Sequence, residues 1–166
     1  QPYNSDLDFG TGDFCVMGWV NKTGNTGNQG YISNGDLTGS NGGWMLGDAS
    51  GALRMWKAAT TSHGTIILTG GSTLPTATWV HFAAVKILGV TKIYLNGVED
   101  GSVADTSNYT FTDAVVDIGY NADYGSYVCD GSLALIRIAA TAPTAAQIAK
   151  IYEDEKFLFQ ENAACT

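Results

Sequence analysis

Short hydrophobic runs alternate with polar turn residues along most of the chain, and the pattern is most regular in residues 78–98. Runs rich in Val, Ile, Trp, Phe and Tyr are typical of half-buried strands. Leu88-Gly89 interrupts the first run, and Asn96-Gly97 ends the second. A two-residue type I′ hairpin favours Asn-Gly, because both positions need positive φ. The stretch predicts an antiparallel meander of two strands and the start of a third, and we expect no binding residue in it.

Further apolar runs recur at roughly 8–12-residue spacing, as in sandwiches and barrels. Residues 14–20 are apolar on both faces, which suits a strand that is covered on both sides. Residues 21–30 are interpreted as a polar loop, with 22–28 at its tip. Alternating apolar positions predict a hairpin with one inward face over residues 44–57. The remaining predicted strands are residues 31–33, 65–69, 114–119 and 133–138.

One short amphipathic helix is predicted near the C-terminus. Thr144 and Gln147 have the spacing of a capping box. Apolar side chains then recur on one helical face, at Ile148, Ile151 and Tyr152. We therefore expect one domain over residues 1–152, followed by an exit segment or linker over 153–166. The apolar residues 157–159 in that segment need a partner surface, inside or outside this chain.

Composition narrows the classes of protein to consider. The 166 residues include 21 glycines, and 14% are charged against a usual value of about 25%, which fits many strands and tight turns. The net charge is −8 and the eight basic residues are scattered, so we expect neither nucleic acid nor a membrane surface as a partner. Gln1 begins no signal peptide, so we expect a processed product or a piece of a longer protein.

The three cysteines, Cys15, Cys129 and Cys165, form neither a disulfide framework nor a zinc motif, because their number is odd and no CxxC occurs. Cys15 and Cys129 lie inside apolar runs and are interpreted as small buried hydrophobes. A Cys15–Cys129 bridge is the alternative, since strands near the two termini often pair in sandwiches.

Four segments of the chain resemble a known family, and they occur in the family's order: 9–20 (FGTGDF, then GWV), 78–83 (TWVHFA), 92–97 (KIYLNG) and 130–152 (DGSL, RI and the helix). They are similar to the laminin-G-like group of concanavalin A-like lectin/glucanase domains. The resemblance implies an all-β fold, a two-sheet antiparallel jelly-roll β-sandwich with one short C-terminal helix. It also implies an extracellular or surface adhesion module that binds glycans or proteins, in some members through calcium.

Residues 151–156 and 159–163 also resemble the exit from such modules in bacteriophage virion and tail proteins. This similarity suggests a virion as one location, with the extracellular space or a cell surface as the other. Other domains of the same parent chain are then expected partners, and a homo-oligomer is a further expectation from this context.

Catalysis is not expected from the acidic residues. The glucanase relatives place paired carboxylates on one strand. The four glutamates here are Glu99, Glu153, Glu155 and Glu161, and only Glu153 and Glu155 are close in sequence, at a helix end. His63 and His81 are isolated from any nucleophile motif, and His81 is interpreted as structural. We predict that the chain is not an enzyme.

Calcium is the one cofactor that the sequence suggests. Hard cations prefer oxygen ligands from loops. Asn121 and Asp123 match the loop where laminin-G-like domains place one calcium ligand, and Asp36 is a substitute for the second family ligand. The alternative is that Asn121 and Asp123 are ordinary turn formers.

The same loop is the best candidate for a glycan site, because sugars are held by aromatic faces with converging polar groups. The candidate ligand-binding residues are Tyr120, Asn121, Asp123, Tyr124 and Tyr127. Trp44 and Trp56 are further candidates, although alternation favours their burial in the core.

These expectations describe a non-catalytic adhesion or structural module of a phage virion or surface protein that binds a glycan or protein receptor. The alternatives are a carbohydrate-binding module of a secreted glycosidase and a bridging domain without a ligand.

Overall fold

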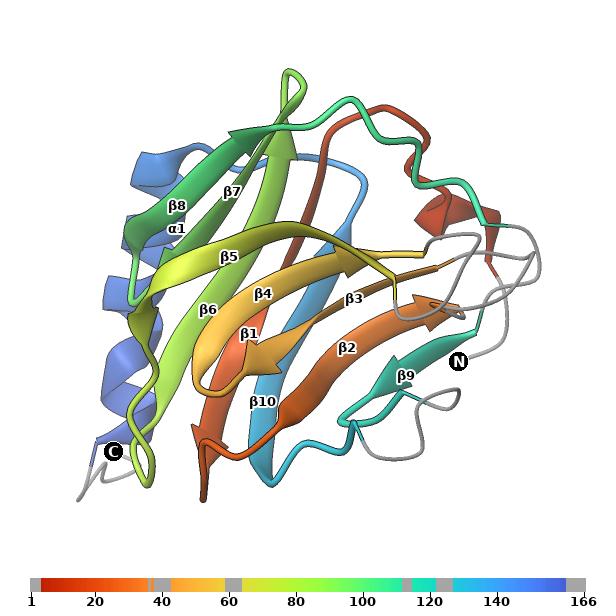
Figure 1. Ribbon diagram of the computed structural model, residues 1–166. Coiled ribbons are helices and arrows are strands. Elements are labelled where there is room, and N and C mark those ends of the chain that lie inside the picture. The colour runs from red at the N-terminus through yellow and green to blue at the C-terminus, as the bar shows by residue number, and fades with distance from the viewer. Residues whose placement is uncertain are drawn as a thin grey trace.

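The computed structural model describes residues 4–35, 37, 43–58, 64–111, 115–121 and 127–160. Ten strands form two antiparallel five-stranded sheets that pack face to face as a sandwich (Figure 1). Sheet A has the order β10 (Gly131–Ala139), β1 (Phe14–Lys22), β6 (Val80–Ile87), β7 (Val90–Leu95) and β8 (Val98–Ala104). Sheet B has the order β5 (Thr65–Thr73), β4 (Ala52–Lys57), β3 (Gly43–Ala49), β2 (Asn28–Gly35) and β9 (Val116–Ile118). The helices are η1 (Ser5–Leu7), α1 (Ala145–Glu155) and η2 (Lys156–Phe159). The predicted all-β jelly-roll architecture with one short C-terminal helix is confirmed.

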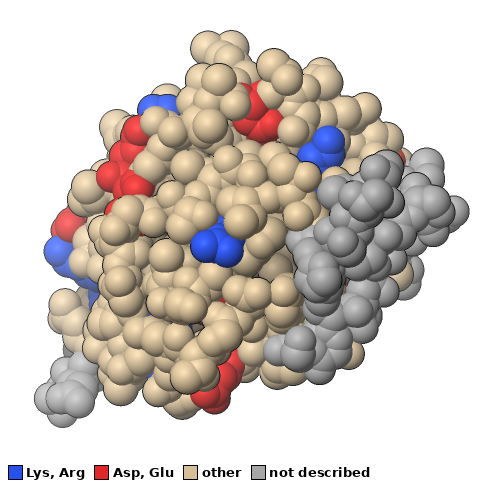
Figure 2. Space-filling model, in the orientation of Figure 1, with Lys and Arg blue, Asp and Glu red and all other residues tan. Residues whose placement is uncertain are grey.

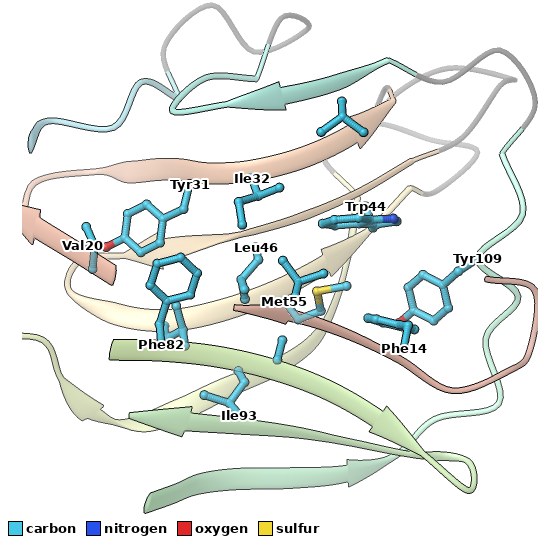
Figure 3. Packing of buried hydrophobic residues seen from close by; sticks show 14 of the residues in the cluster. Phe14, Val20, Tyr31, Ile32, Trp44, Leu46, Met55, Phe82, Ile93 and Tyr109 are labelled. Atoms are coloured by element: carbon cyan, nitrogen blue, oxygen red, sulfur yellow. The ribbon is translucent and has the colours of Figure 1, made fainter. Parts of the chain in front are cut away.

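The main core lies between the two sheets and is built from the inward side chains of each (Figure 3). Phe14 from sheet A stacks on Phe9 at 4.8 Å between ring centroids and meets Tyr109 edge-on at 4.9 Å. Trp44 and Leu46 of β3 point into this core, as the alternation predicts. Aromatic side chains bury large apolar areas, so this cluster supplies much of the driving force for closing the sandwich.

A second layer covers the outer face of sheet A. Along β1 the side chains alternate, so that Phe14 and Val16 enter the main core while Cys15 and Met17 face α1. Ile148 of the helix is fully buried against them, and Figure 1 shows α1 lying along this face. The prediction that residues 14–20 are covered on both sides is therefore confirmed.

The local turn and cap signals have the predicted geometry. Asn96 and Gly97 have φ of 48° and 80°, as the second hairpin of the meander requires. The Asn96 side chain also accepts a hydrogen bond from the His81 backbone at 2.9 Å, which ties this turn to β6. Thr144 caps α1 and forms the capping box with Gln147.

The interpretation of residues 22–28 as a loop tip is wrong at both ends. Lys22 ends β1 and Asn28 begins β2. Lys22 is 1% exposed, and its ammonium lies 2.9 Å from the carboxylate of Asp48 on β3. The Tyr31 hydroxyl and the Gly51 amide donate to the same carboxylate at 3.0 and 2.8 Å. A buried charge needs such partners, and this ion pair joins the two sheets.

Both described cysteines are free thiols, so the alternative of a Cys15–Cys129 bridge is wrong. Cys15 lies under α1, whereas Cys129 packs against the core on the other side of sheet A. Burial raises the pKa of the Cys15 thiol to about 12 and that of Cys129 to about 11. Cys165 lies outside the described residues.

The domain boundary after Tyr152 stays a prediction, but α1 continues to Glu155 and η2 follows it directly. Phe159 of η2 packs between Trp19 and Trp79, so part of the predicted exit segment has its partner surface within this chain. Phe157 and Leu158 remain exposed.

Candidate functional site

The predicted binding loop begins at the free edge of sheet B. β9 pairs with β2, and Gly119 then turns the chain with φ of 75°. The Gly119 amide donates to the Tyr31 carbonyl at 2.8 Å, and the Cys129 amide donates to the Gly119 carbonyl at 2.9 Å. The chain thus leaves and returns at one place beside β2. We call residues 119–121 and 127–130 the edge segment.

Tyr120 is the exposed aromatic residue of the edge segment. The residue is 39% exposed, while its carbonyl accepts a hydrogen bond from the Ser33 hydroxyl at 3.2 Å. The backbone is therefore fixed on β2 and the ring remains accessible. An accessible, anchored aromatic face can stack on the apolar face of a sugar ring.

Tyr127 lies beside the outer face of sheet B. Its hydroxyl accepts a hydrogen bond from the Asn28 amide at 2.8 Å, and its ring packs against a small cluster that includes Met45 and Trp56. Tyr127 and Tyr120 are thus held on the same edge of the sheet by different contacts. Asn28 was missed from the sequence, because it was assigned to a loop rather than to a strand.

The other predicted site residues divide into two groups. Asn121 is 0% exposed, so its side chain is held inside the fold next to Tyr120. Asp36, Asp123 and Tyr124 lie outside the described residues. The structure therefore brings Tyr120, Asn121 and Tyr127 to one edge and leaves the other three predictions untested.

A second feature of the same face is a stacked cation. The Arg54 guanidinium lies 5.4 Å from the centre of the Trp56 ring, and its Nε donates to the Thr69 hydroxyl at 2.9 Å. Trp56 is buried as expected, on the outer side of the sheet rather than in the main core. The spacing of Arg54 and Trp56 along β4 is the sequence signal that places both on this face. In Figure 2, charged side chains occur singly on the visible surface of sheet B.

Each of the three described glutamates forms an ion pair. Glu99 pairs with Lys92 at 2.7 Å, and Glu153 and Glu155 pair with Lys156 and Arg137. Each of these carboxylates is held by a cation, which suits a structural role. Glu161 and His63 lie outside the described residues.

His81 is fully buried under α1, where its ring contacts both Trp19 and Tyr152. Neither ring nitrogen has a hydrogen-bond partner among the described residues. Burial lowers the pKa of this imidazole to about 4, so the ring is neutral near pH 7.

The described residues offer little to a calcium ion. No three His, Cys, Asp or Glu side chains come together in the described ranges. Of the three predicted ligands only Asn121 is described, and it is buried. A calcium site at this loop stays a prediction.

Among the described helices, none is long and apolar enough to cross a membrane. The architecture is that of a jelly-roll β-sandwich with aromatic residues at one sheet edge. The chain belongs to the concanavalin A-like lectin/glucanases superfamily, whose laminin G-type model matches residues 3–149. A search of curated protein sequences finds no match.

Several solved structures share this fold at low sequence identity. The CBM40 module of the Ruminococcus gnavus IT-sialidase, bound to alpha2,3 sialyllactose, superposes with a TM-score of 0.70 and 14% identity over 87% of this chain and 84% of that one. Domain 4 of AbnA, a GH43 extracellular arabinanase from Geobacillus stearothermophilus in complex with arabinotriose, is a second example. It superposes with a TM-score of 0.68 and 20% identity over 86% of this chain and 68% of that one. The SAP-like pentraxin of Limulus polyphemus superposes with a TM-score of 0.63 and 16% identity over 84% of this chain and 69% of that one.

Proposed function

We propose that this chain is a non-catalytic glycan-binding module of an extracellular protein, and that the edge segment contacts the glycan. The observation that carries the proposal is the exposed Tyr120 ring on a backbone anchored to β2, beside the Tyr127–Asn28 hydrogen bond. An anchored backbone reduces the freedom that the segment loses on binding, which favours affinity. Membership of a lectin superfamily supports glycans over other ligands.

A secreted glycosidase is the parent that the comparisons favour. The modules named above come from a sialidase and from an extracellular arabinanase, and their structures hold bound saccharides. Neither the family match nor these structures indicate a bacteriophage virion. The virion parent rests only on the short resemblance near the C-terminus, part of which lies outside the described residues.

A glycan array with the full chain tests the proposal. We expect selective binding that falls about two- to tenfold in Tyr120→Ala, because an aromatic stacking contact contributes about 0.5–1.5 kcal/mol. Leu88→Ala is the matched control, since Leu88 is 88% exposed in the β6–β7 turn and is not part of the edge segment. The proposal would be overturned if no glycan on the array bound the chain. Release of reducing sugar from a bound glycan would also overturn it.

A further inference from the structure

A pocket of about 500 Å³ lies at one end of the sandwich, where the chain between β5 and β6 meets η2. Its walls include Asn21 at the end of β1, Thr78 and Trp79 before β6, and Phe159 and Gln160 at the end of η2. None of the lining residues belongs to the edge segment. Figure 1 shows the C-terminal end of α1, which η2 follows, at this end of the sandwich. The volume is in the range of small-ligand sites, about 300–1,000 Å³.

The aromatic wall of the pocket is fixed by packing. The Phe159 ring stacks on Trp19 at 4.4 Å between centroids and lies 4.7 Å from Trp79 on its other side. Trp19 is itself held by a 2.8 Å hydrogen bond from its indole nitrogen to Glu155. The positions of Trp79 and Phe159 are therefore set before any ligand arrives, which lowers the entropic cost of binding.

Another part of the pocket lining is fixed through the backbone. Ala77 adopts φ of 54°, an unfavourable region for a residue with a Cβ atom. Its amide donates to the Lys22 carbonyl at 2.8 Å, and Lys22 is locked to Asp48 by the buried ion pair. These contacts hold Thr78 beside the end of β1, where Asn21 lies.

The chemistry of the walls selects one class of ligand. The polar groups are the amides of Asn21 and Gln160 and the hydroxyl of Thr78, and none of the seven described residues that line the pocket is charged. The described lining residues offer no counter-ion to an anionic or cationic ligand, and a lipid chain would leave the amides unpaired. A neutral sugar ring matches the pocket, since its C–H face suits an aromatic wall and its hydroxyls suit amides.

We propose that this pocket is a second saccharide subsite, which takes one ring of a neutral glycan between Trp79 and the side chains of Asn21 and Gln160. The inference rests on the proposal that the chain binds glycans, but it does not require that the edge segment is the binding site. With two contact regions on one module, a long glycan or a repeated glycan surface would be bound with higher avidity than either region provides alone.

The test uses the full chain and neutral hexasaccharides of the cello-, xylo-, manno-, laminari- and arabino- series. Each saccharide is titrated into the protein, and binding is measured by calorimetry and by the NMR signal of the Trp79 indole. We expect that signal to shift with at least one neutral series, and affinity to fall about tenfold in Trp79→Ala and severalfold in Asn21→Ala and Gln160→Ala. Leu88→Ala is again the control. Gln160→Ala changes an exposed side chain, so it remains informative if Trp79→Ala does not fold.

The outcomes separate this inference from the proposed function. Loss of binding in Tyr120→Ala, with unchanged affinity in the pocket variants and no Trp79 shift, would overturn the second subsite and leave the edge segment in place. Loss in the pocket variants with unchanged affinity in Tyr120→Ala would support the subsite and remove the edge segment from the proposal. No binding of any neutral saccharide would overturn the subsite, and binding of sialyllactose at Trp79 would overturn its neutral preference.

Discussion

The indole nitrogen of Trp19 donates a hydrogen bond to the Glu155 carboxylate at 2.8 Å, which joins the middle of sheet A to the last turn of α1. Arg137 of β10 binds the other oxygen of the same carboxylate. Trp19 is almost fully buried and Glu155 is largely buried. One carboxylate thus fixes the end of the helix over the sheet and supports the aromatic stack that ends at Trp79.

Glu155→Ala should therefore lower the free energy of unfolding by about 1–3 kcal/mol, because the Trp19 N–H would lose its acceptor in a buried site. The measurement is urea denaturation followed by tryptophan fluorescence. Glu153→Ala is the matched control, since Glu153 is exposed and its ion pair with Lys156 is worth little. Equal stability of the two variants would contradict the structural role of Glu155.

His81 should make the fold sensitive to acid. Its pKa is about 4 in the folded chain against an ordinary value of 6.5, so the unfolded chain takes up the proton first as the pH falls. The free energy of unfolding should therefore fall by about 3 kcal/mol through this residue, progressively between about pH 6.5 and pH 4. Two charged groups act on the ring: Glu155 favours the charged imidazolium, and Arg137 opposes it.

The measurement is the unfolding free energy of the wild type and of His81→Leu over that pH range. The difference between the two unfolding free energies reports on His81 alone, because the wild type and the variant share all other titrating groups. A difference that does not change between pH 7 and pH 4 would show that His81 keeps its ordinary pKa.

Much of the fold could be predicted from local signals. Asn96-Gly97 determines its own turn, and Thr144 with Gln147 determines the start of α1, because these interactions span only a few residues. The alternation of Trp44 and Leu46 fixes the buried face of β3 in the same way. Such patterns reveal which elements form and which side of each is buried.

Contacts between distant residues could not be predicted in this way. The polar neighbours of Lys22 predict a loop tip, yet Lys22 is buried in an ion pair with Asp48 of another strand. Asn28 belongs to a strand because β3 pairs with it. The pocket beside Trp79 depends on Phe159, which is 80 positions further along, and no local pattern connects the two. Of the candidate site, the sequence groups Tyr120 and Tyr127 around one loop, but it predicts neither their position at the edge of sheet B nor the burial of Asn121.

The buried pair of Lys22 and Asp48 should show strong coupling. Removal of one partner leaves an uncompensated buried charge, which costs about 3–5 kcal/mol. Lys22→Met and Asp48→Leu should each approach that loss, whereas the double variant should be more stable than the sum of the two losses implies. A double-mutant cycle by denaturation measures this coupling. Additive losses would mean that the two charges do not depend on each other.

Calcium binding at the predicted loop would appear as a rise in melting temperature. A ligand at 100 times its dissociation constant stabilises the fold by about 2.7 kcal/mol. We expect the rise with millimolar calcium, its reversal by a chelator, and its loss in Asp123→Ala, with the exposed Asp154→Ala as the control. A wild-type melting temperature that does not change with calcium would contradict the predicted calcium site.

The free thiols should be nearly inert in the folded chain. Burial raises the pKa of Cys15 to about 12, so almost none of it is thiolate at mildly alkaline pH. In a Cys129→Ser/Cys165→Ser background, an alkylating reagent should modify Cys15 only as fast as the chain unfolds. Mass spectrometry measures the rate, and rapid labelling without denaturant would be the contrary result.

The placement of α1 has a consequence for how such a module can diversify. Sheet A has the main core on one side and the helix on the other, so both faces of β1 and of β6 are committed to packing. Any new specificity must therefore arise on sheet B or at the ends of the sandwich. A mutant library that aims to change the ligand should leave the packed residues of β1 and β6 untouched and vary the edge segment and the surroundings of Trp79, including Asn21 at the end of β1.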